Sequence, residues 1–334
     1  MIYFIFLNLF FLFFFSRLKS IYGIFDHSNE ERKIHKGKIS VIGGFFLFLN
    51  LILLSFFYIA EEILNIKIIG ITSLFESTRE SFSFFFTSFL IFIFGYFDDR
   101  WKIKPYKKLF LLSIAILTFI LINKYSLIKS LNFLFLDTPL QLKDFSFLFT
   151  FLCIIILINA INMFDGVNLQ ISLYSIFIFV VFYIKSNNNF FLILIFFFVI
   201  FLLLNAQNKA FMGDSGSLLL GFIFSFFFIN FYNEEKLMVE EIILLSFLPI
   251  IEFLRIFIYR IYSRRNPFKA DSIHLHHFLF ANFNFKSLII ISLCLFSFPY
   301  FFYFLGLDFI FITIFFIIIY FYLLSFLKKN NIYK

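Results

Sequence analysis

Eleven long apolar runs separated by short polar segments dominate the chain. They lie at 1–17, 40–60, 81–97, 109–123, 145–163, 169–185, 190–204, 216–232, 239–259, 287–304 and 307–327. A helix crosses the hydrocarbon core of a membrane with about 17–25 apolar residues, which these runs reach or approach. The pattern predicts an all-α, polytopic membrane protein with about eleven transmembrane helices. The first run lacks a basic leader and a small-residue cleavage site, so we expect a retained span rather than a signal peptide.

Composition supports this prediction and excludes a soluble domain. Of the 334 residues, 62% are hydrophobic and only 14% are charged. The 66 phenylalanines fill apolar positions and carry no functional prediction. Cys153 and Cys294 lie within apolar runs, where we expect buried hydrophobic side chains rather than a disulfide or a metal site. We interpret 1–334 as a single integral membrane domain.

Basic residues predict the orientation of the chain. Eleven spans place the termini on opposite sides, and with the N-terminus outside, the inner segments hold twenty Lys and Arg against seven in the outer ones. Cytoplasmic loops carry this excess, so the C-terminus is predicted to be cytoplasmic. The net charge of +8 is then concentrated on one face, where it attracts anionic headgroups or anionic soluble substrates.

Two clusters of polar residues stand at the predicted cytoplasmic ends of spans. Asp98 and Asp99 follow the third run, where a solvated end cap is the alternative interpretation. Asn159, Asn162 and Asp165 are spaced i, i+3 and i+6, so the fifth run would carry them down one helical face toward the same surface. The alternative for these residues is a polar packing seam between helices.

A third cluster is the Gly-Asp-Ser-Gly-Ser turn at 213–217. Asp214 lies between two glycines and the next apolar run begins directly afterwards, so backbone N–H groups and a helix N-terminus would face a ligand there. This arrangement suits a metal-bound phosphate, and a simple tight turn is the alternative.

A fourth cluster is the loop at 264–279. It holds His274, His276 and His277 together with Arg264, Arg265 and Lys269. Zinc is the alternative interpretation, but no Cys lies on this face and the positive charge disfavours a bound dication. Arg and His donate hydrogen bonds to phosphate oxygens, and His can also relay a proton, so the loop favours phosphate handling.

All four clusters fall on the face that basic residues select. Carboxylates, amides, glycine turns and cationic donors together predict a Mg²⁺-dependent site for phosphates at the bilayer surface, because Mg²⁺ prefers oxygen ligands and shares its coordination with phosphate. One partner could be a membrane lipid phosphate, and the other a soluble nucleotide.

Five ordered motifs between about 22 and 280 carry a family resemblance. They are DHSNEERKIHKGK (26–38) leading to Gly43–Gly44, GYFDDR (95–100) with Pro105 and Lys108, NAINMFDG (159–166), FMGDSGS (211–217) and PFKADSIHLHH (267–277). With them the sequence resembles the polyprenyl-phosphate N-acetylhexosamine-1-phosphate transferases of bacteria. This family includes the phospho-N-acetylmuramoyl-pentapeptide transferase and the undecaprenyl-phosphate N-acetylglucosaminyl 1-phosphate transferases.

The resemblance implies a reaction and assigns roles to residues. The reaction would transfer N-acetylhexosamine 1-phosphate from a UDP-sugar to undecaprenyl phosphate at the cytoplasmic face of the bacterial inner membrane, releasing UMP and starting a lipid-linked envelope glycan such as O-antigen. The implied catalytic residues are Asp98, Asp99, Asp165 and His276; the implied substrate-binding residues are Lys108, Asn159, Asn162, Arg265, His274 and His277; the implied ligands of Mg²⁺, or Mn²⁺ in its place, are Asp214 and Asp165. A homodimer is possible, and no nucleic acid is expected.

The HLHH form of the histidine motif is more similar to the N-acetylglucosaminyl type than to the muramoyl-pentapeptide type. It therefore favours a plain UDP-N-acetylhexosamine, and we expect UDP-N-acetylglucosamine as the donor. The chain departs from the family pattern at Ser40–Val41, at Asn168–Leu169 and at Glu252, where Asp is usual. These departures concern sugar choice and pocket detail. One competing class is a cation-coupled transporter, which predicts acids near the bilayer midplane and matched halves. A second is the CDP-alcohol phosphatidyltransferases, whose acids and Arg gather in one short segment that is absent here. A transferase with muramoyl-pentapeptide or another N-acetylated sugar as donor is a further alternative.

Overall fold

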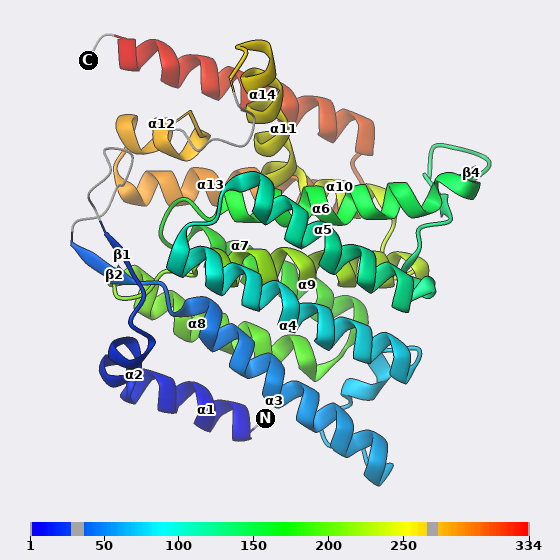
Figure 1. Cartoon of the computed structure of the whole chain (residues 1–334). Helices are drawn as coiled ribbons and strands as arrows, with labels where there is room; N and C mark the ends of the chain where they lie inside the picture. The colour runs from blue at the N-terminus through cyan, green and yellow to red at the C-terminus, as the bar shows by residue number, and fades with distance from the viewer. Residues whose placement is uncertain (1, 28–36, 266–272, 333–334) are drawn as a thin grey trace. The chain divides into compact units, whose positions relative to one another are not determined.

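A computed structural model of the chain describes residues 2–27, 37–265 and 273–332. It divides into two compact units, each described here by itself. The first unit comprises Met1–Ser130 and Gln141–Lys236, and the second comprises Leu131–Leu140 and Leu237–Lys334. Figure 1 shows the helices of both units and their labels.

Helices make up most of the first unit. They are α1 (Ile2–Phe13), α2 (Phe15–Tyr22), α3 (Gly43–Leu64), α4 (Thr78–Trp101), α5 (Pro105–Ile122), α6 (Ser146–Phe164), α7 (Gln170–Ser186), α8 (Asn189–Ala206) and α9 (Gly213–Asn233). Short 3₁₀ helices lie at η1 (Ile71–Leu74), η2 (Lys124–Ser126) and η3 (Lys143–Phe145), and strand β1 (Phe25–His27) pairs antiparallel with β2 (Lys38–Ser40). Strands β3 (Ser130–Leu131) and β4 (Leu140–Gln141) form a second small ladder.

Helix α9 is the core of the first unit. Its apolar window is 94% buried, whereas that of α5 is 28% buried. Helices α3, α4 and α6 pack against α9. At the crossing with α4, a Cβ on Gly95 would lie 2.8 Å from the carbonyl oxygen of Asp214, so only glycine lets the two backbones approach this closely. The first turn of α9 is therefore held against the last turns of α4.

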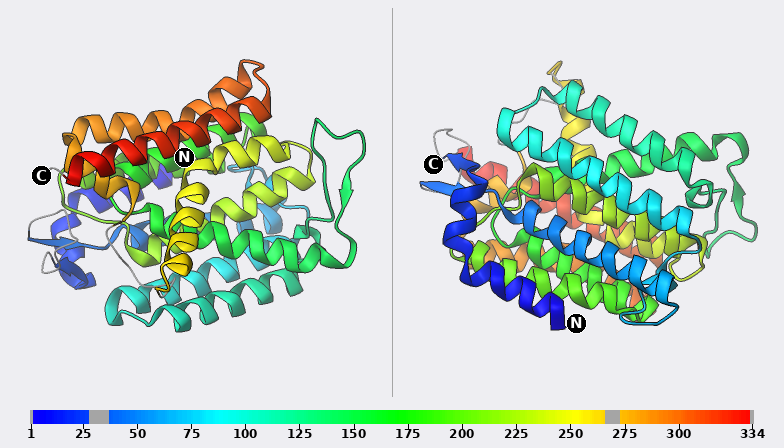
Figure 2. Two further views of the ribbon diagram at one scale, coloured as in Figure 1. Left: turned by 90° about the horizontal axis from the view of Figure 1, so that it is seen from above. Right: turned by 60° about the horizontal axis from the view of Figure 1, so that its bottom comes forward.

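The second unit contains the C-terminal helices. They are α10 (Val239–Leu245), α11 (Phe247–Tyr262), α12 (Leu275–Asn282), α13 (Phe285–Phe304) and α14 (Phe309–Ile332). Helix α13 packs against α10 and α14, and α12 packs against α14. Figure 2 shows α13 and α14 running alongside each other.

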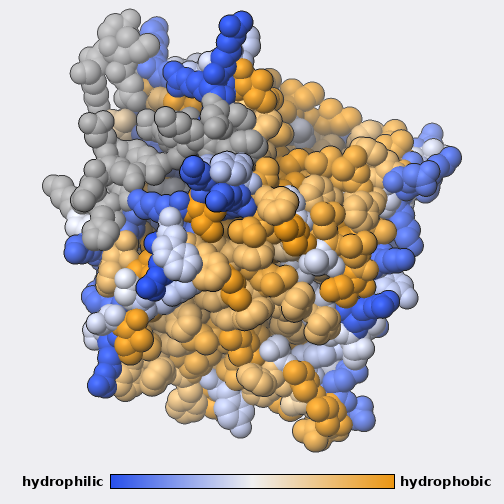
Figure 3. Space-filling model, in the orientation of Figure 1, coloured by the Kyte–Doolittle hydropathy of each residue, from blue (hydrophilic) through white to orange (hydrophobic). Residues whose placement is uncertain are grey.

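The described helices confirm an all-α polytopic membrane protein. A helix forms at the position of every predicted run, and eight are long and apolar enough to cross a membrane, or up to ten if each of two bent pairs is one span. Helix α7, with 17 residues, is shorter. Over the first unit, Figure 3 shows hydrophobic residues along the helices and hydrophilic residues gathered at their ends. The count of eleven spans and the sidedness of the termini stay predictions.

Two predicted runs are bent rather than straight. Helices α1 and α2 meet at 77°, and α10 and α11 meet at 69° around Ser246. Pro249 lies in the first turn of α11, where its missing N–H is tolerated but its ring excludes a continuous helix through Leu245. The run at 239–259 therefore breaks where its sequence places proline.

Candidate active site

Four helix ends meet in the first unit and carry three of the predicted polar clusters. They are the C-terminal ends of α4 and α6 and the N-terminal ends of α5 and α9. Lys108 stands in the first turns of α5, which Pro105 begins with its preset helical φ. Lys108 Nζ lies 2.8 Å from Asp98 Oδ2 and 2.7 Å from Asp214 Oδ1. Lys108 thus joins Asp98 to Asp214, an acid 106 positions beyond Lys108 in the sequence.

Asp98 is held at the end of α4 by both of its oxygens. Oδ2 pairs with Lys108, and Oδ1 accepts a 2.8 Å hydrogen bond from the backbone N–H of Ile103. The chain can turn back toward Asp98 because Lys102 adopts a left-handed φ of 49° and ends the helix. The side chain is 8% exposed, so the carboxylate sits just below the surface.

Asn162 joins the same cluster from α6. Its Oδ1 accepts a 3.2 Å hydrogen bond from Lys108, and its Nδ2 donates to Asp214 Oδ1 at 2.6 Å and to Ser217 Oγ at 2.8 Å. Asn159, one turn earlier, donates instead to the carbonyl of Ile155 within its own helix. The amide at 162 therefore orients Asp214, whereas the amide at 159 makes a local bond.

Asp99 has a different environment from its neighbour Asp98. Its Oδ1 accepts a 2.7 Å hydrogen bond from the backbone N–H of Asp214, and its Oδ2 accepts a 3.0 Å bond from that of Ser215. These N–H groups belong to the first turn of α9, which has no intrahelical acceptor for them. Gly213 has a φ of 74°, and a Cβ there would lie 2.8 Å from Asp99 Oδ2, so the turn requires glycine. Asp99 is thus the N-terminal cap of α9.

The contact of Asp99 with the first turn of α9 was not predicted from sequence, where Asp98 and Asp99 were interpreted as one acidic pair. The signal that could have found it is the Gly-Asp-Ser sequence, since a helix that begins with glycine and has no upstream Ser, Thr or Asn cap needs an acceptor from elsewhere.

Asp165 ends α6 and lies beside Asp214. Burial, followed by the negative charge of Asp214, raises the pKa of Asp165 to about 7. A cation close to this carboxyl group would favour its ionised form.

The oxygens of Asp165 and Asp214 fit Mg²⁺ by their chemistry. Across the described ranges no group of three or more His, Cys, Asp or Glu side chains is arranged to hold a metal ion. Mg²⁺ does not need such a cage, because it is usually bound by one or two carboxylates together with substrate phosphates and water. The residues present therefore suit an ion that arrives with a phosphate, and its binding stays a prediction.

The fourth cluster belongs to the second unit. His274 and His276 are buried, and the ring of His276 lies 5.1 Å from that of His274 and 4.5 Å from that of His277. Burial, followed by the neighbouring His274, His277 and Arg255, lowers the pKa of His276 well below its usual value. His276 is therefore a neutral imidazole near pH 7. Arg265 is exposed just after α11.

The histidines and the acids lie in different units, so their predicted meeting in one pocket stays a prediction. Most of the motif at 26–38 and the start of the motif at 267–277 fall on 28–36 and 266–272, outside the described residues.

Glu252 was noted from sequence only as a departure from the family pattern, and neither Glu252 nor Arg255 was predicted as a site residue. They pair with each other in α11 and bond to the backbone on either side of His274. The signal was present in the sequence, because two charges three positions apart inside an apolar run are costly unless they are paired.

Comparisons with known proteins agree with this geometry. Residues 81–232 match the glycosyl transferase family 4 model, and this range includes all the acids of the first unit's cluster. The chain is 24% identical over 301 residues to the undecaprenyl-phosphate alpha-N-acetylglucosaminyl 1-phosphate transferase of Escherichia coli O157:H7, covering 80% of this chain and 72% of that protein.

Other relatives give the same result. The enzyme of the same name from Salmonella typhi is 24% identical over 285 residues, covering 76% of this chain and 68% of its own. The one from Escherichia coli strain K12 is 23% identical over 300 residues, covering 80% and 72%. The resemblance predicted from the motifs is confirmed by these comparisons: residues 81–232 match the glycosyl transferase family 4 model, and about four fifths of the chain is similar to undecaprenyl-phosphate alpha-N-acetylglucosaminyl 1-phosphate transferases.

Proposed function

We propose that the protein transfers N-acetylhexosamine 1-phosphate, with N-acetylglucosamine as the preferred sugar, from a UDP-sugar to undecaprenyl phosphate. UMP leaves, and the lipid-linked sugar starts a cell-envelope glycan. The family domain and the names of the relatives support the reaction class. The observation that carries the proposal is the Lys108 ammonium bound between Asp98 and Asp214 where four helix ends meet.

The reaction brings together two anionic substrates, a nucleoside diphosphate sugar and a lipid phosphate. Their repulsion is the main electrostatic obstacle, so the site must supply positive charge. Lys108 supplies a fixed cation, and the N-terminus of α9 adds the positive end of a helix dipole. When bound at Asp165 and Asp214, Mg²⁺ would neutralise the diphosphate and make UMP a better leaving group.

We assign the lipid phosphate to Asp98 rather than to Asp99. Both oxygens of Asp99 are engaged by N–H groups of α9, whereas Asp98 shares its cation with Asp214. In this proposal Lys108 binds both the Asp98 carboxylate and the incoming lipid phosphate, and Asp98 orients the attacking phosphate oxygen. This oxygen attacks the sugar-bound phosphorus of the UDP-sugar directly, and the bond from that phosphorus to UMP breaks.

The cytoplasmic face of the bacterial inner membrane is the proposed location. The basic segments near the acid cluster favour it, because positive residues collect on the cytoplasmic side. UDP-sugars are soluble anions, and this basic face would attract them.

The decisive experiment incubates purified protein with Mg²⁺, undecaprenyl phosphate and one of several donors: UDP-N-acetylglucosamine, UDP-N-acetylgalactosamine or UDP-N-acetylmuramoyl-pentapeptide. We expect UMP release and a lipid-linked sugar with the first donor, and loss of both when EDTA removes divalent ions. Turnover with the pentapeptide donor alone would change the assigned sugar. No UMP from any donor, in a preparation that instead drives cation-coupled uptake into vesicles, would replace the transferase with a transporter.

A further inference from the structure

A buried ion pair in α11 lies next to the histidine segment. Arg255 Nη2 is 2.7 Å from Glu252 Oε1, and the two side chains are 8% and 7% exposed. Burying charged side chains in an apolar helix costs free energy, so such residues suggest a functional role. The pair lies beyond residues 81–232, the range that matches the family model, and Glu252 is the position at which the chain departs from the usual Asp of the family pattern.

Both members of the pair bind the backbone that leads into α12. Glu252 Oε1 accepts a 2.7 Å hydrogen bond from the N–H of Leu275, and Arg255 Nη2 donates a 2.8 Å bond to the carbonyl of Ile273. His274 lies between these two anchored residues, with Nδ1 3.7 Å from Glu252 Oε1. The peptide units on both sides of the first histidine are thus fixed by one ion pair.

The last helix completes this arrangement. Tyr320 of α14 is fully buried, donates its hydroxyl to Glu252 Oε2 and accepts a 2.6 Å hydrogen bond from Arg255 Nε. Further along α14, the carbonyl of Leu327 accepts a 3.3 Å bond from Asn282 Nδ2 at the end of α12. Helix α14 therefore bonds directly to the end of α12 and is linked to its start through Glu252 and Arg255.

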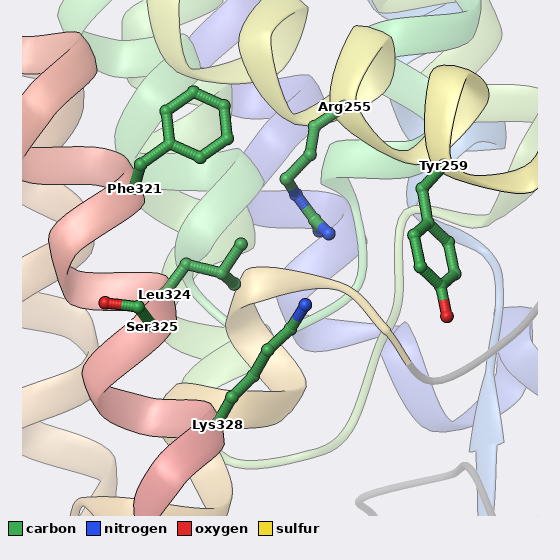
Figure 4. Close-up of a pocket in the computed structure, with 6 residues that line it drawn as sticks. All are labelled: Arg255, Tyr259, Phe321, Leu324, Ser325 and Lys328. Atoms are coloured by element: carbon green, nitrogen blue, oxygen red, sulfur yellow. The ribbon is translucent and has the colours of Figure 1, made fainter. Parts of the chain in front are cut away.

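A cavity of about 340 Å³ between α11 and α14 borders the same ion pair. Figure 4 shows Arg255 and Lys328 pointing toward this space from the two helices. Lys328 also lies 5.8 Å from the centres of the Tyr259 and Phe278 rings. The hydrogen bonds of Glu252, Arg255 and Tyr320 border this space on the α11 side.

We propose that Glu252, Arg255 and Tyr320 form a positioning frame that sets the conformation of the histidine segment for substrate phosphate. The frame gives α14, which carries none of the family motifs, a part in the site. The inference rests on the proposed function for its catalytic consequence, but the frame itself is a property of the second unit alone.

The first test measures the frame without any substrate. Hydrogen exchange followed by mass spectrometry on the full-length protein in detergent reports the amide of Leu275 within a peptide covering 273–282. We expect Glu252→Gln and Tyr320→Phe to speed exchange in this peptide by about tenfold or more, as loss of a charge-assisted hydrogen bond predicts.

Tyr322→Phe is the matched control, because Tyr322 is 71% exposed on the same helix and the chemical change is identical. Tyr320→Phe is nearly isosteric and should leave the protein folded, which size-exclusion chromatography verifies. Equal exchange in wild type and both frame variants would overturn the proposal.

The second test measures turnover of the UDP-sugar. We expect Glu252→Gln to lower kcat by about tenfold or more with little change in KM for undecaprenyl phosphate, and Glu252→Asp to restore part of the loss because it keeps the charge. Wild-type kcat in Glu252→Gln, despite faster exchange, would show a merely structural role and overturn the catalytic part of the proposal. An inactive wild type would instead count against the proposed function, while the exchange result would still decide whether the frame exists.

Discussion

Asp98 and Asp99 are adjacent in sequence but bind different partners. Asp98 pairs with Lys108, whereas Asp99 caps α9 through the N–H groups of Asp214 and Ser215. Successive helical residues point about 100° apart, so adjacency places the two carboxylates on different sides of α4. Asp98 is therefore the acid to which we assign a role in the proposed reaction, whereas Asp99 caps the helix that bears Asp214.

Neutralising Asp99 should therefore mainly affect stability, whereas neutralising Asp98 should mainly affect turnover. We expect Asp99→Asn to lower stability by about 1–3 kcal/mol, because the amide NH₂ would face a backbone N–H that needs an acceptor. Asp98→Asn should instead lower kcat strongly, with a smaller loss of stability, because Lys108 keeps Asp214 as a partner and the Asn oxygen can still accept from the N–H of Ile103. Thermal unfolding in detergent and UMP release, measured on both variants, provide the comparison; equal loss of stability in both would contradict the division of roles.

Lys108 can be tested against its sequence neighbour. Lys108→Met removes the cation shared by Asp98 and Asp214, and we expect turnover to fall by about a hundredfold or more, given the size of such electrostatic contributions. Lys107→Met is the control, because Lys107 is exposed on the same turn of α5. Similar activity in the two variants would remove Lys108 from the site.

The low pKa of His276 predicts that acid destabilises the second unit. An unfolded chain takes up a proton on this histidine near pH 6.5, whereas the folded unit resists it. Stability should be fully present above about pH 6.5 and should fall below it, by up to about 1.4 kcal/mol per pH unit. Melting temperatures between about pH 7.5 and 5.5 should drop less in His276→Gln than in wild type; parallel curves would show that another group titrates.

At the scale of the helices, the contact between α4 and α9 depends on glycine. In an open helix, Gly→Ala is stabilising by about 1 kcal/mol. At Gly95 the new methyl group would meet the backbone of Ser215 and Asp214, so we expect Gly95→Ala to be destabilising and to reduce turnover by displacing Asp214. Unfolding and UMP release measure both effects, and an unchanged or raised stability would show that the crossing is looser than described.

The apolar runs predicted where helices form, but they did not predict every helix shape. Continuous hydrophobicity marks burial in lipid or protein and says nothing of a bend, so the break at Ser246 was missed although Pro249 signalled it. Likewise the i, i+3, i+6 spacing placed Asn159 and Asn162 on one face, yet only Asn162 reaches Asp214. The difference depends on which neighbour lies opposite each residue, and that neighbour is fifty or more positions away.

At the scale of the whole molecule, the orientation prediction can be tested directly. Replacing Cys153 and Cys294 with Ser gives a background in which Lys107→Cys and Lys67→Cys each provide one thiol. We expect an impermeant maleimide added to intact cells to label Lys67→Cys alone, and to label Lys107→Cys only after the membrane is opened. The reverse pattern would place the acid cluster outside, away from cytoplasmic nucleotides.

The burial of α9 has a consequence for biosynthesis. A ribosome makes Asp99 more than a hundred residues before it makes the N–H groups that this carboxylate caps. The helices α3, α4 and α6, which pack against α9, are also made before it. Synthesis of α9 would therefore complete the acid cluster and the packing of the first unit together.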